Sequence, residues 1–318
     1  MNKKHKILII KTGYSEFLEE ENNSNRVSLG DVFRTTLLLH LYKNDHVTWV
    51  TDKKAFPLLE GNFYINRLLE YDFTTAEQLK EEKFDTLINL EKVPGICALA
   101  DRISAWRRYG FRFDSEKGKA EAYDRAFEAL AVSANPKLKK ENNKSFQELL
   151  FDMVGAKWKG EGYILSYQPK TKGIYDVCLN TQIGEKWPTK AWTTEYWDEL
   201  EERLIKDNLK VTRQDKQNKE ILTNIHKYID WINSCKLIVS NDSLGLYLGP
   251  ILKKKVLGLF GSTYDKSVYF YEYGKVILPE PIPDCLPCFK SSCERGKNCM
   301  KDISQERVYK EIKNMQPI

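Results

Sequence analysis

No stretch of the 318-residue sequence contains the roughly eighteen consecutive apolar residues that a membrane-spanning helix requires. The first apolar run, residues 7–10, is too short for the core of a signal peptide and fits a buried strand better. The sequence also has no close internal repeat and no long low-complexity tract. These absences predict a cytoplasmic protein without a membrane span.

The charges of the chain are close to balanced. It has 50 Lys and Arg residues against 45 Asp and Glu residues, a formal net charge of +5. This mild excess favours an anionic substrate or a membrane surface without requiring either.

The seven cysteines fall into two groups. Cys97, Cys178 and Cys235 occur singly in apolar surroundings, which predicts buried thiols. The other four lie within fifteen residues near the C-terminus: Cys285, Cys288, Cys293 and Cys299. Four thiolates that converge tetrahedrally suit structural zinc or a single iron ion, and the spacing does not choose between them. Two disulfides or four reduced thiols are the other interpretations. We expect a metal, because cytosolic cysteine clusters more often bind metals than form disulfides.

Apolar runs and amphipathic stretches alternate along the chain. Strands are expected at residues 6–11, 46–51, 67–71, 85–90, 175–180, 236–240 and 255–260, and helices at 30–42, 75–82, 194–207 and from 243. This alternation predicts parallel sheets with right-handed crossovers. The polar stretch 166–173 has the composition of a linker. We therefore expect two doubly wound α/β domains, residues 1–168 and 169–318.

Ligands of such open sheets bind beyond the carboxyl ends of the strands. Polar loops follow the expected strands there, at residues 12–27, 180–192, 240–245 and 260–263. A helix start rich in Ser and Gly suits a diphosphate, and a lysine on a facing loop, such as Lys190, would neutralise its charge.

Four of these segments carry a family resemblance. Residues 29–36, LGDVFRTT, resemble the opening signature of glycosyltransferase family 9, the bacterial heptosyltransferase family. Residues 187–192, WPTKAW, are similar to the family's donor-side segment. Residues 240–248 and 259–263 resemble two further elements of the family. Their order and spacing match from about residue 6 to about residue 264.

The resemblance implies a GT-B fold, in which an N-terminal acceptor domain and a C-terminal donor domain face each other across a cleft. A final helix tends to cross back in that fold. The implied reaction is inverting transfer of a sugar, commonly heptose from ADP-heptose, to a lipopolysaccharide-core sugar. Asp31 matches the family's proposed general base, and Lys190 and Asp242 match residues that face the donor. The rest of the expected donor-binding set is Ser243, Gly245, Ser262 and Thr263.

The resemblance also bears on the cysteines. Some relatives that heptosylate autotransporter proteins carry a cysteine-held iron near the C-terminus, and the cluster here looks similar. The leaving diphosphate develops charge that Lys190 and the helix start at Ser243 can stabilise, so no catalytic divalent metal is expected. The cysteine-bound ion, iron or zinc, is therefore expected to be structural.

Three features depart from the family pattern. Tyr247 stands where the family usually has histidine, and Leu244 where glycine is frequent. The loop 12–27 is longer than usual, and we expect it to be an acceptor lid or a tolerated insertion.

These departures leave alternatives open. One is a catalytically degraded glycosyltransferase-like protein that binds sugar or acts as a scaffold. Another is a metal ribbon that binds nucleic acid, but the cysteine region lacks the expected interleaving of basic and aromatic residues, so no nucleic acid is expected. The expected partners are a nucleotide-sugar donor and a glycan or protein acceptor. Peripheral contact with the inner membrane and a homo-oligomer are also possible.

Overall fold

The computed structural model describes residues 4–15, 26–184, 186–216, 224–263 and 265–315. The chain divides into two compact units, residues 1–167 and 168–318. We describe each unit by itself.

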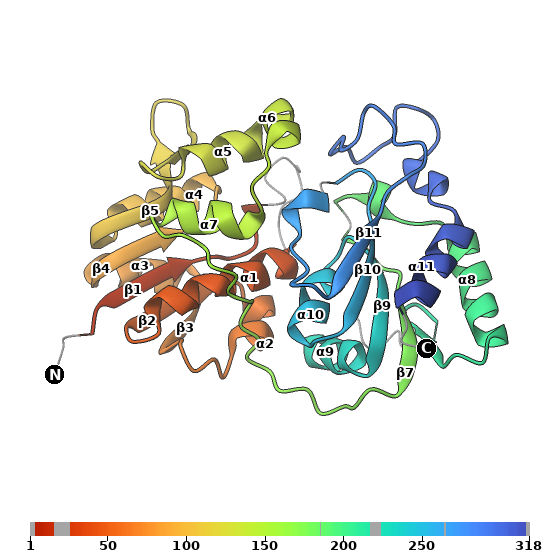
Figure 1. Cartoon of the computed structure of the whole chain (residues 1–318). Helices are drawn as coiled ribbons and strands as arrows, with labels where there is room; N and C mark the ends of the chain where they lie inside the picture. Colours follow the sequence, from red (N-terminus) through yellow and green to blue (C-terminus); the bar gives the residue numbers. More distant parts are fainter. Residues whose placement is uncertain (1–3, 16–25, 185, 217–223, 264, 316–318) are drawn as a thin grey trace. The chain divides into compact units, whose positions relative to one another are not determined.

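The first unit is built on a six-stranded sheet in the order β3-β2-β1-β4-β5-β6 (Figure 1). All neighbours are parallel except β5 and β6, which are antiparallel. The bounds are β1 Lys6–Ile10, β2 His46–Thr51, β3 Arg67–Glu70, β4 Lys83–Asn89, β5 Ser104–Asp114 and β6 Lys119–Ala122. Strand β1 is almost wholly apolar because it lies between two neighbours and is buried on both faces.

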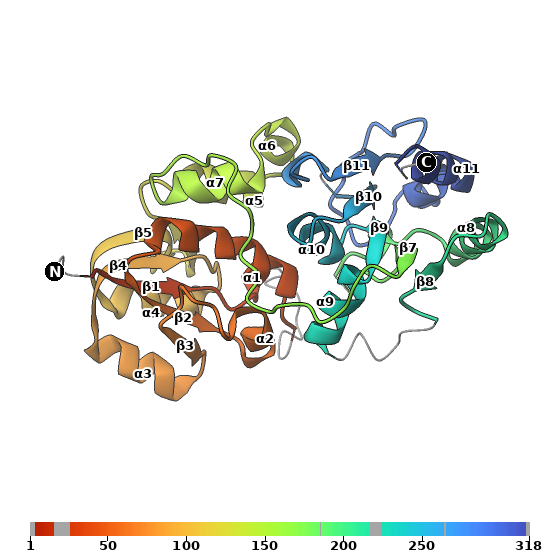
Figure 2. The same ribbon diagram turned by 60° about the horizontal axis from the view of Figure 1, so that its bottom comes forward.

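The helices of the first unit cover both faces of this sheet. Helices α3 and α4 pack side chains such as Leu79 and Leu99 against one face, and α1 lies on the other (Figure 2). The bounds are α1 Leu29–Thr35, α2 Phe56–Leu59, α3 Phe73–Glu81, α4 Pro94–Arg102, α5 Phe127–Ala134, α6 Pro136–Glu141 and α7 Phe146–Met153. Helix α7 begins with a capping box, in which Ser145 and Glu148 each bind the other's backbone N–H.

The second unit is built on a five-stranded parallel sheet in the order β11-β10-β9-β7-β8. Its strands are β7 Tyr175–Asn180, β8 Val211–Arg213, β9 Cys235–Asn241, β10 Lys255–Leu259 and β11 Gly274–Ile277. Its helices are α8 Thr194–Lys206, α9 Ile225–Asn233, α10 Gly245–Ile251 and α11 Gln305–Met315. Trp197 of α8 and Ile312 of α11 belong to one core cluster with Leu257 of β10.

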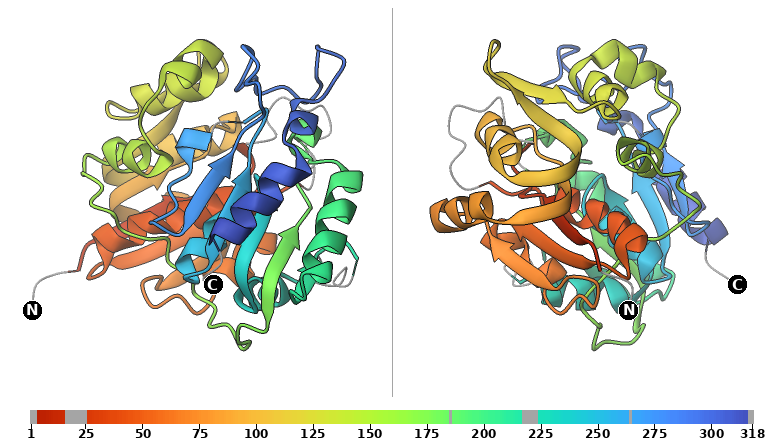
Figure 3. Two further views of the ribbon diagram at one scale, coloured as in Figure 1. Left: turned by 45° about the vertical axis from the view of Figure 1, so that its right-hand side comes forward. Right: turned by 90° about the vertical axis from the view of Figure 1, so that its left-hand side faces the viewer.

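Helix α11 lies beside α8 in the second unit (Figure 3). The expected crossing of the final helix to the first unit stays a prediction. Its apolar residues Val308, Ile312 and Met315 are buried in that core, and Tyr309 donates a hydrogen bond to Asp207 at 2.5 Å. The apolar face of α11 is thus buried within the same unit as the helix itself.

The single cysteines differ partly from expectation. Cys97 is a buried thiol as predicted, and burial raises its pKa to about 12. Cys178 of β7 and Cys235 of β9 are paired in a disulfide, with their Cα atoms 5.8 Å apart. Neighbouring strands bring these residues within disulfide range, a proximity that their spacing in the sequence does not reveal.

Most predicted elements are confirmed to within about two residues, and β2 and β7 match at both ends. The expected helix at 30–42 is instead the short helix α1 followed by a 3₁₀ helix at Thr36–Tyr42. The last helix before β10 begins at Gly245 rather than Ser243. Among the described residues, no helix is long and apolar enough to cross a membrane.

Candidate functional site

In the first unit, Asp31 lies in the first turn of α1 beside a buried ion pair. Lys11 follows β1 and Glu91 follows β4, and these strands are neighbours, so both residues reach the same edge of the sheet. The Nζ atom of Lys11 lies 3.1 Å from Oε1 of Glu91 and 3.8 Å from Oδ2 of Asp31. The side chains of Lys11 and Glu91 are 5% and 0% exposed, whereas that of Asp31 is 33% exposed. Asp31 is therefore the accessible carboxylate of the three residues.

Glu91 also fixes the stem of the long loop after β1. It accepts hydrogen bonds from the backbone N–H groups of Gly13 at 2.7 Å and Ser15 at 2.9 Å. Gly13 has a φ of +90°, and its carbonyl accepts a hydrogen bond from the N–H of Ser28 at 3.0 Å. The stem is thus closed just before Asp31. Residues 16–25 of the predicted acceptor lid lie outside the described residues, so the lid stays a prediction.

In the second unit, Lys190 and Asp242 form an ion pair with 2.8 Å between Nζ and Oδ2. Lys190 belongs to the loop after β7, and Asp242 follows β9, the neighbour of β7. Their side chains are 14% and 11% exposed, so the pair is largely buried but still reaches the surface. The resemblance predicted that both residues face the donor, and the structure brings them into direct contact.

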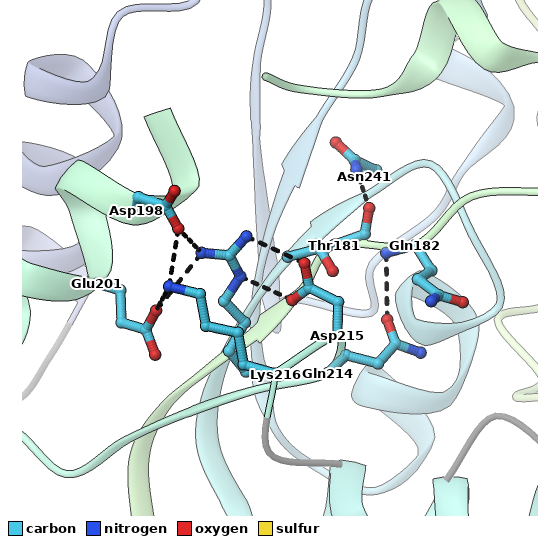
Figure 4. Close-up of polar contacts among 9 residues, drawn as sticks. Thr181, Gln182, Asp198, Glu201, Gln214, Asp215, Lys216 and Asn241 are labelled. Atoms are coloured by element: carbon cyan, nitrogen blue, oxygen red, sulfur yellow. Dashed lines mark hydrogen bonds and ion pairs between the residues drawn. The ribbon is translucent and has the colours of Figure 1, made fainter. Parts of the chain in front are cut away.

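Buried amides tie together the loops that carry this pair. Asn241 donates a hydrogen bond to the carbonyl of Thr181 at 2.7 Å (Figure 4). It also accepts a hydrogen bond from the N–H of Trp192 at 3.2 Å. Gln214 accepts a hydrogen bond from the N–H of Gln182 at 3.2 Å. These amides satisfy backbone groups that the sheet leaves unpaired at its edge.

Asn180, the last residue of β7, links side chains near the start of α10. It donates to the hydroxyls of Ser240 at 2.7 Å and Ser243 at 2.8 Å, and accepts from the hydroxyl of Tyr228 at 3.1 Å. A Cβ atom on Gly245 would lie 2.6 Å from Nδ2 of Asn180. Packing within the protein therefore explains the glycine at 245. A donor role for Ser243 and Gly245 stays a prediction.

The loop after β10 contains the last two predicted donor residues. The hydroxyl of Ser262 is buried and lies 2.9 Å from that of Thr189. The hydroxyl oxygens of Thr263 and Thr181 are buried and have no hydrogen-bond partner within the described chain. A buried polar group without a partner is costly. A donor role for Ser262 and Thr263 stays a prediction.

A dense ionic cluster anchors the end of β8 nearby. Arg213, which is 1% exposed, binds Asp215 at 2.7 Å and Asp198 at 2.5 Å. Lys216 lies 2.8 Å from Asp198 (Figure 4). Hydrogen bonds from Lys216 and Arg213 lower the pKa of Asp198. Every charge here has a partner within the cluster, so we assign it a structural role.

The predicted metal site is not formed. Among the residues that the structure describes, no group of three or more Cys, His, Asp or Glu side chains is arranged to hold a metal ion. Cys285 is exposed and Cys299 is buried, and the structure gives all four cysteines of the cluster as free thiols. Burial, together with the charges of the other three, raises the pKa of Cys299 to about 11. The four thiols are near enough to interact and their chemistry suits a soft metal, but their sulfurs do not converge.

Several supporting residues escaped sequence reasoning, among them Glu91, Thr189 and Asn241. Glu91 directly follows the expected strand 85–90, and from the sequence alone it looks like an ordinary surface carboxylate. Asn241 is adjacent to the predicted Asp242, and its position as the last residue of a central strand is the one signal that marks it.

Comparisons with known proteins indicate the family of this chain. The family model described as glycosyltransferase family 9 (heptosyltransferase) matches residues 73–298. Lipooligosaccharide heptosyltransferase 2 of Campylobacter jejuni is 29% identical over 122 residues, which are 38% of this chain and 37% of that protein. The chain thus matches little more than a third of the length of that curated relative.

Solved structures show the same fold. The Escherichia coli ADP-heptose lps heptosyltransferase II has a TM-score of 0.66 at 15% identity, with 98% of each chain covered. The E. coli heptosyltransferase WaaC with ADP has a TM-score of 0.63 at 12% identity, over 98% of this chain and 100% of that one. The iron-containing dodecameric glycosyltransferase TibC of enterotoxigenic E. coli has a TM-score of 0.58 at 11% identity, over 98% of this chain and 76% of that one. The predicted α/β fold of GT-B type is confirmed.

Proposed function

The chain belongs to glycosyltransferase family 9, and on that premise we propose that it transfers a sugar, with inversion, from a nucleotide-sugar donor to a glycan or protein acceptor. The observation that carries the proposal is the pair Lys190–Asp242 at the carboxyl edge of the second sheet. A positioned cation at this edge suits a nucleoside diphosphate.

Lys190 would stabilise the leaving diphosphate. The charge that develops on the leaving group needs a positioned cation, and the contact with Asp242 holds the flexible lysine in one place. Such a site needs no catalytic divalent metal. We infer ADP-heptose as the donor, because the solved relatives include complexes with ADP and with ADP-2-deoxy-2-fluoro heptose.

Asp31 would act as the general base in the first unit. Inversion requires that the acceptor hydroxyl lose its proton as it attacks from the side opposite the diphosphate. Asp31 is the accessible carboxylate of its cluster, and its Oδ2 atom lies 3.8 Å from Nζ of Lys11. Glu91, fully buried and bound to Lys11 and to backbone N–H groups, has no free face for that task.

The acceptor follows from the relatives by analogy. A lipooligosaccharide or lipopolysaccharide core sugar is the first candidate, because the curated relative is a lipooligosaccharide heptosyltransferase. A protein hydroxyl is the second. The proposed setting is the cytoplasm, with peripheral contact with the inner membrane. A homo-oligomer is proposed by analogy with dodecameric TibC.

The cysteine cluster is proposed to hold one structural ion, iron or zinc. Cys285, Cys288, Cys293 and Cys299 would supply four thiolates. Support comes from the donor set, four thiols within fifteen residues of the sequence. Binding would draw the sulfurs together and stabilise this loop, and no step of the transfer passes through the ion.

A panel of ADP-, UDP-, GDP- and CMP-sugars tested by thermal shift would identify the donor, because a ligand that binds only the native state raises its unfolding midpoint. We expect ADP-heptose to give the largest shift and release of ADP to require the acceptor. A protein that binds the donor but never releases ADP with any core-sugar or protein acceptor would instead be the degraded, sugar-binding alternative. Tyr247 and Leu244 motivate that alternative.

A further inference from the structure

Thr189, the neighbour of Lys190, is held by a part of the chain with no role in donor binding so far. We call residues 285–299 the cysteine segment. The hydroxyl of Thr189 donates a hydrogen bond to the carbonyl of Lys290 in this segment at 2.6 Å. It also lies 2.9 Å from the hydroxyl of Ser262, in the loop after β10. Thr189 therefore joins three loops at one atom.

The number of protons on each group determines which group donates each of these hydrogen bonds. A threonine hydroxyl has one proton, and the carbonyl of Lys290 can only accept it. The bond between the two hydroxyls therefore uses the proton of Ser262. Thr189 is 7% exposed and Ser262 is 1% exposed, so loss of the Thr189 hydroxyl would leave the buried hydroxyl of Ser262 without this partner. The carbonyl of Lys290 would lose the same partner.

Two further contacts hold the cysteine segment to the loop after β10. The N–H of Phe289 donates to the carbonyl of Ser262 at 2.8 Å. At the other end of the segment, a Cβ atom on Gly261 would lie 3.0 Å from the sulfur of Cys299. The segment thus packs on Gly261 and Ser262 at both of its ends, and Thr189 connects this assembly to Lys190.

We propose that Thr189 is a positioning residue through which the cysteine segment holds the loop of Lys190 in the conformation that binds the donor diphosphate. The inference rests on the proposed function, because it explains what holds Lys190 in the position where it would bind the donor diphosphate. Lys190 is a long, flexible side chain, and its partner Asp242 fixes only its tip. If the loop backbone were free to move, only a fraction of molecules would present the lysine correctly, and the apparent Kd would rise in inverse proportion to that fraction.

The test measures the Kd of ADP for the purified full chain by titration calorimetry. Thr189→Val keeps the shape of the side chain but removes its hydroxyl, and we expect the Kd to rise roughly tenfold. Thr189→Ser keeps the hydroxyl and should restore the Kd to within about twofold of wild type. Thr212→Val is the matched control. Thr212 is also buried and accepts a hydrogen bond from Trp231 at 3.2 Å, but it belongs to strand β8 rather than to the loop of Lys190.

A double-mutant cycle shows whether Thr189 acts through Lys190. In the Lys190→Ala background the lysine is gone, so adding Thr189→Val should raise the Kd by less than about twofold. If Thr189→Val does not fold, Ser262→Ala removes the hydrogen bond between Ser262 and Thr189 instead. As a single variant it should weaken ADP binding, and in the Lys190→Ala background it should weaken ADP binding no further.

The outcomes separate the inference from the proposed function. Folded Thr189→Val with the wild-type Kd would overturn the inference, as would an equal loss in the presence and absence of Lys190. In both cases wild type would still bind ADP and Lys190→Ala would still bind it less tightly. Wild type that binds no nucleoside diphosphate would overturn the proposed function, and the inference with it.

Discussion

The ammonium group of Lys11 lies 3.1 Å from the carboxylate of Glu91, and both side chains are almost completely buried. Glu91 in turn binds two backbone N–H groups at the stem of the loop after β1. The pair therefore joins the ends of two neighbouring strands next to Asp31. Removal of one member would leave the other, in a buried position, without its charged partner at 3.1 Å.

We expect Glu91→Gln to lower the free energy of unfolding by about 3–5 kcal/mol, since Lys11 would keep a buried charge. Lys11→Met combined with Glu91→Gln should recover part of that loss. Glu70→Gln is the matched control, because Lys53 and Glu70 are 3.6 Å apart but 67% and 44% exposed. Its effect should be below about 1 kcal/mol. Urea denaturation gives all three values, and similar losses for Glu91→Gln and Glu70→Gln would contradict the prediction.

The sequence predicts the strands of this fold better than the long-range side-chain contacts that hold its loops. Strands such as β2 and β7 are short apolar runs between polar loops, and their periodicity suffices to locate them. The position of Asp31 after the first strand, and of Lys190 and Asp242 after neighbouring strands, follows from the rule for open sheets. Direct contact between Lys190 and Asp242 follows less directly, because it needs the strand order of the second sheet.

Other features depend on tertiary contacts that no local pattern encodes. The ion pair of Lys11 with Glu91 joins residues 80 positions apart, and the bond of Thr189 with Lys290 spans 101 positions. The disulfide of Cys178 with Cys235 depends on the pairing of β7 with β9. Spacing is informative when ligands are close in sequence, as in the cysteine cluster, but it does not show whether the sulfurs converge.

Asp31→Asn should slow sugar transfer by a hundredfold or more while the Kd of the donor stays within about twofold of wild type. The amide keeps the shape of the side chain but cannot take a proton from the acceptor. Single-turnover rates with saturating donor and acceptor give the comparison. Turnover close to wild type in this variant would remove Asp31 from the role of base.

Lys190→Ala should weaken the donor and free ADP by similar factors, because the lost contact is to phosphate rather than to sugar. Lys186, in the same loop, is the control, since its ammonium lies over the ring of Trp187, 5.2 Å from the centroid. Lys186→Ala should leave ADP binding within about twofold of wild type. Equal affinities for ADP in wild type and Lys190→Ala, measured at the same ionic strength, would place Lys190 outside the donor site.

Glu82 provides a pH-dependent contribution to stability. Arg67 donates hydrogen bonds to its carboxylate at 2.7 and 2.9 Å, and these bonds lower the pKa of Glu82. A carboxylate with a lowered pKa in the folded state stabilises the protein above its unfolded pKa, and the effect disappears as the pH falls. Glu82→Gln should therefore cost up to about 1 kcal/mol at pH 7, with a smaller difference below the ordinary pKa of 4.5. Urea titrations at both pH values test this, and a difference that does not change with pH would contradict it.

The cysteine segment should bind one iron or zinc ion per chain when the protein is expressed without a chelator. A polar loop of this length cannot bury a core of its own, so its folding free energy would come largely from metal binding. Serine at Cys285, Cys288, Cys293 or Cys299 should therefore lower metal content and the unfolding midpoint together. The rate of transfer per folded, donor-saturated molecule should fall much less, since Asp31 and Lys190 lie on other loops. Cys97→Ser is the control, because Cys97 is buried apart from the segment and should not change metal content.

Elemental analysis distinguishes the two metals, because iron held by thiolates is coloured and zinc is not. Mass spectrometry without reduction gives an independent count, in which Cys178 and Cys235 are joined and five cysteines are free after metal removal. Absence of stoichiometric metal, with two disulfides among the four clustered cysteines, would contradict the metal site. Absence of metal with all four thiols free would contradict it as well. In that case the contacts of Thr189 and Ser262 with the cysteine segment would have to hold the loop without an ion.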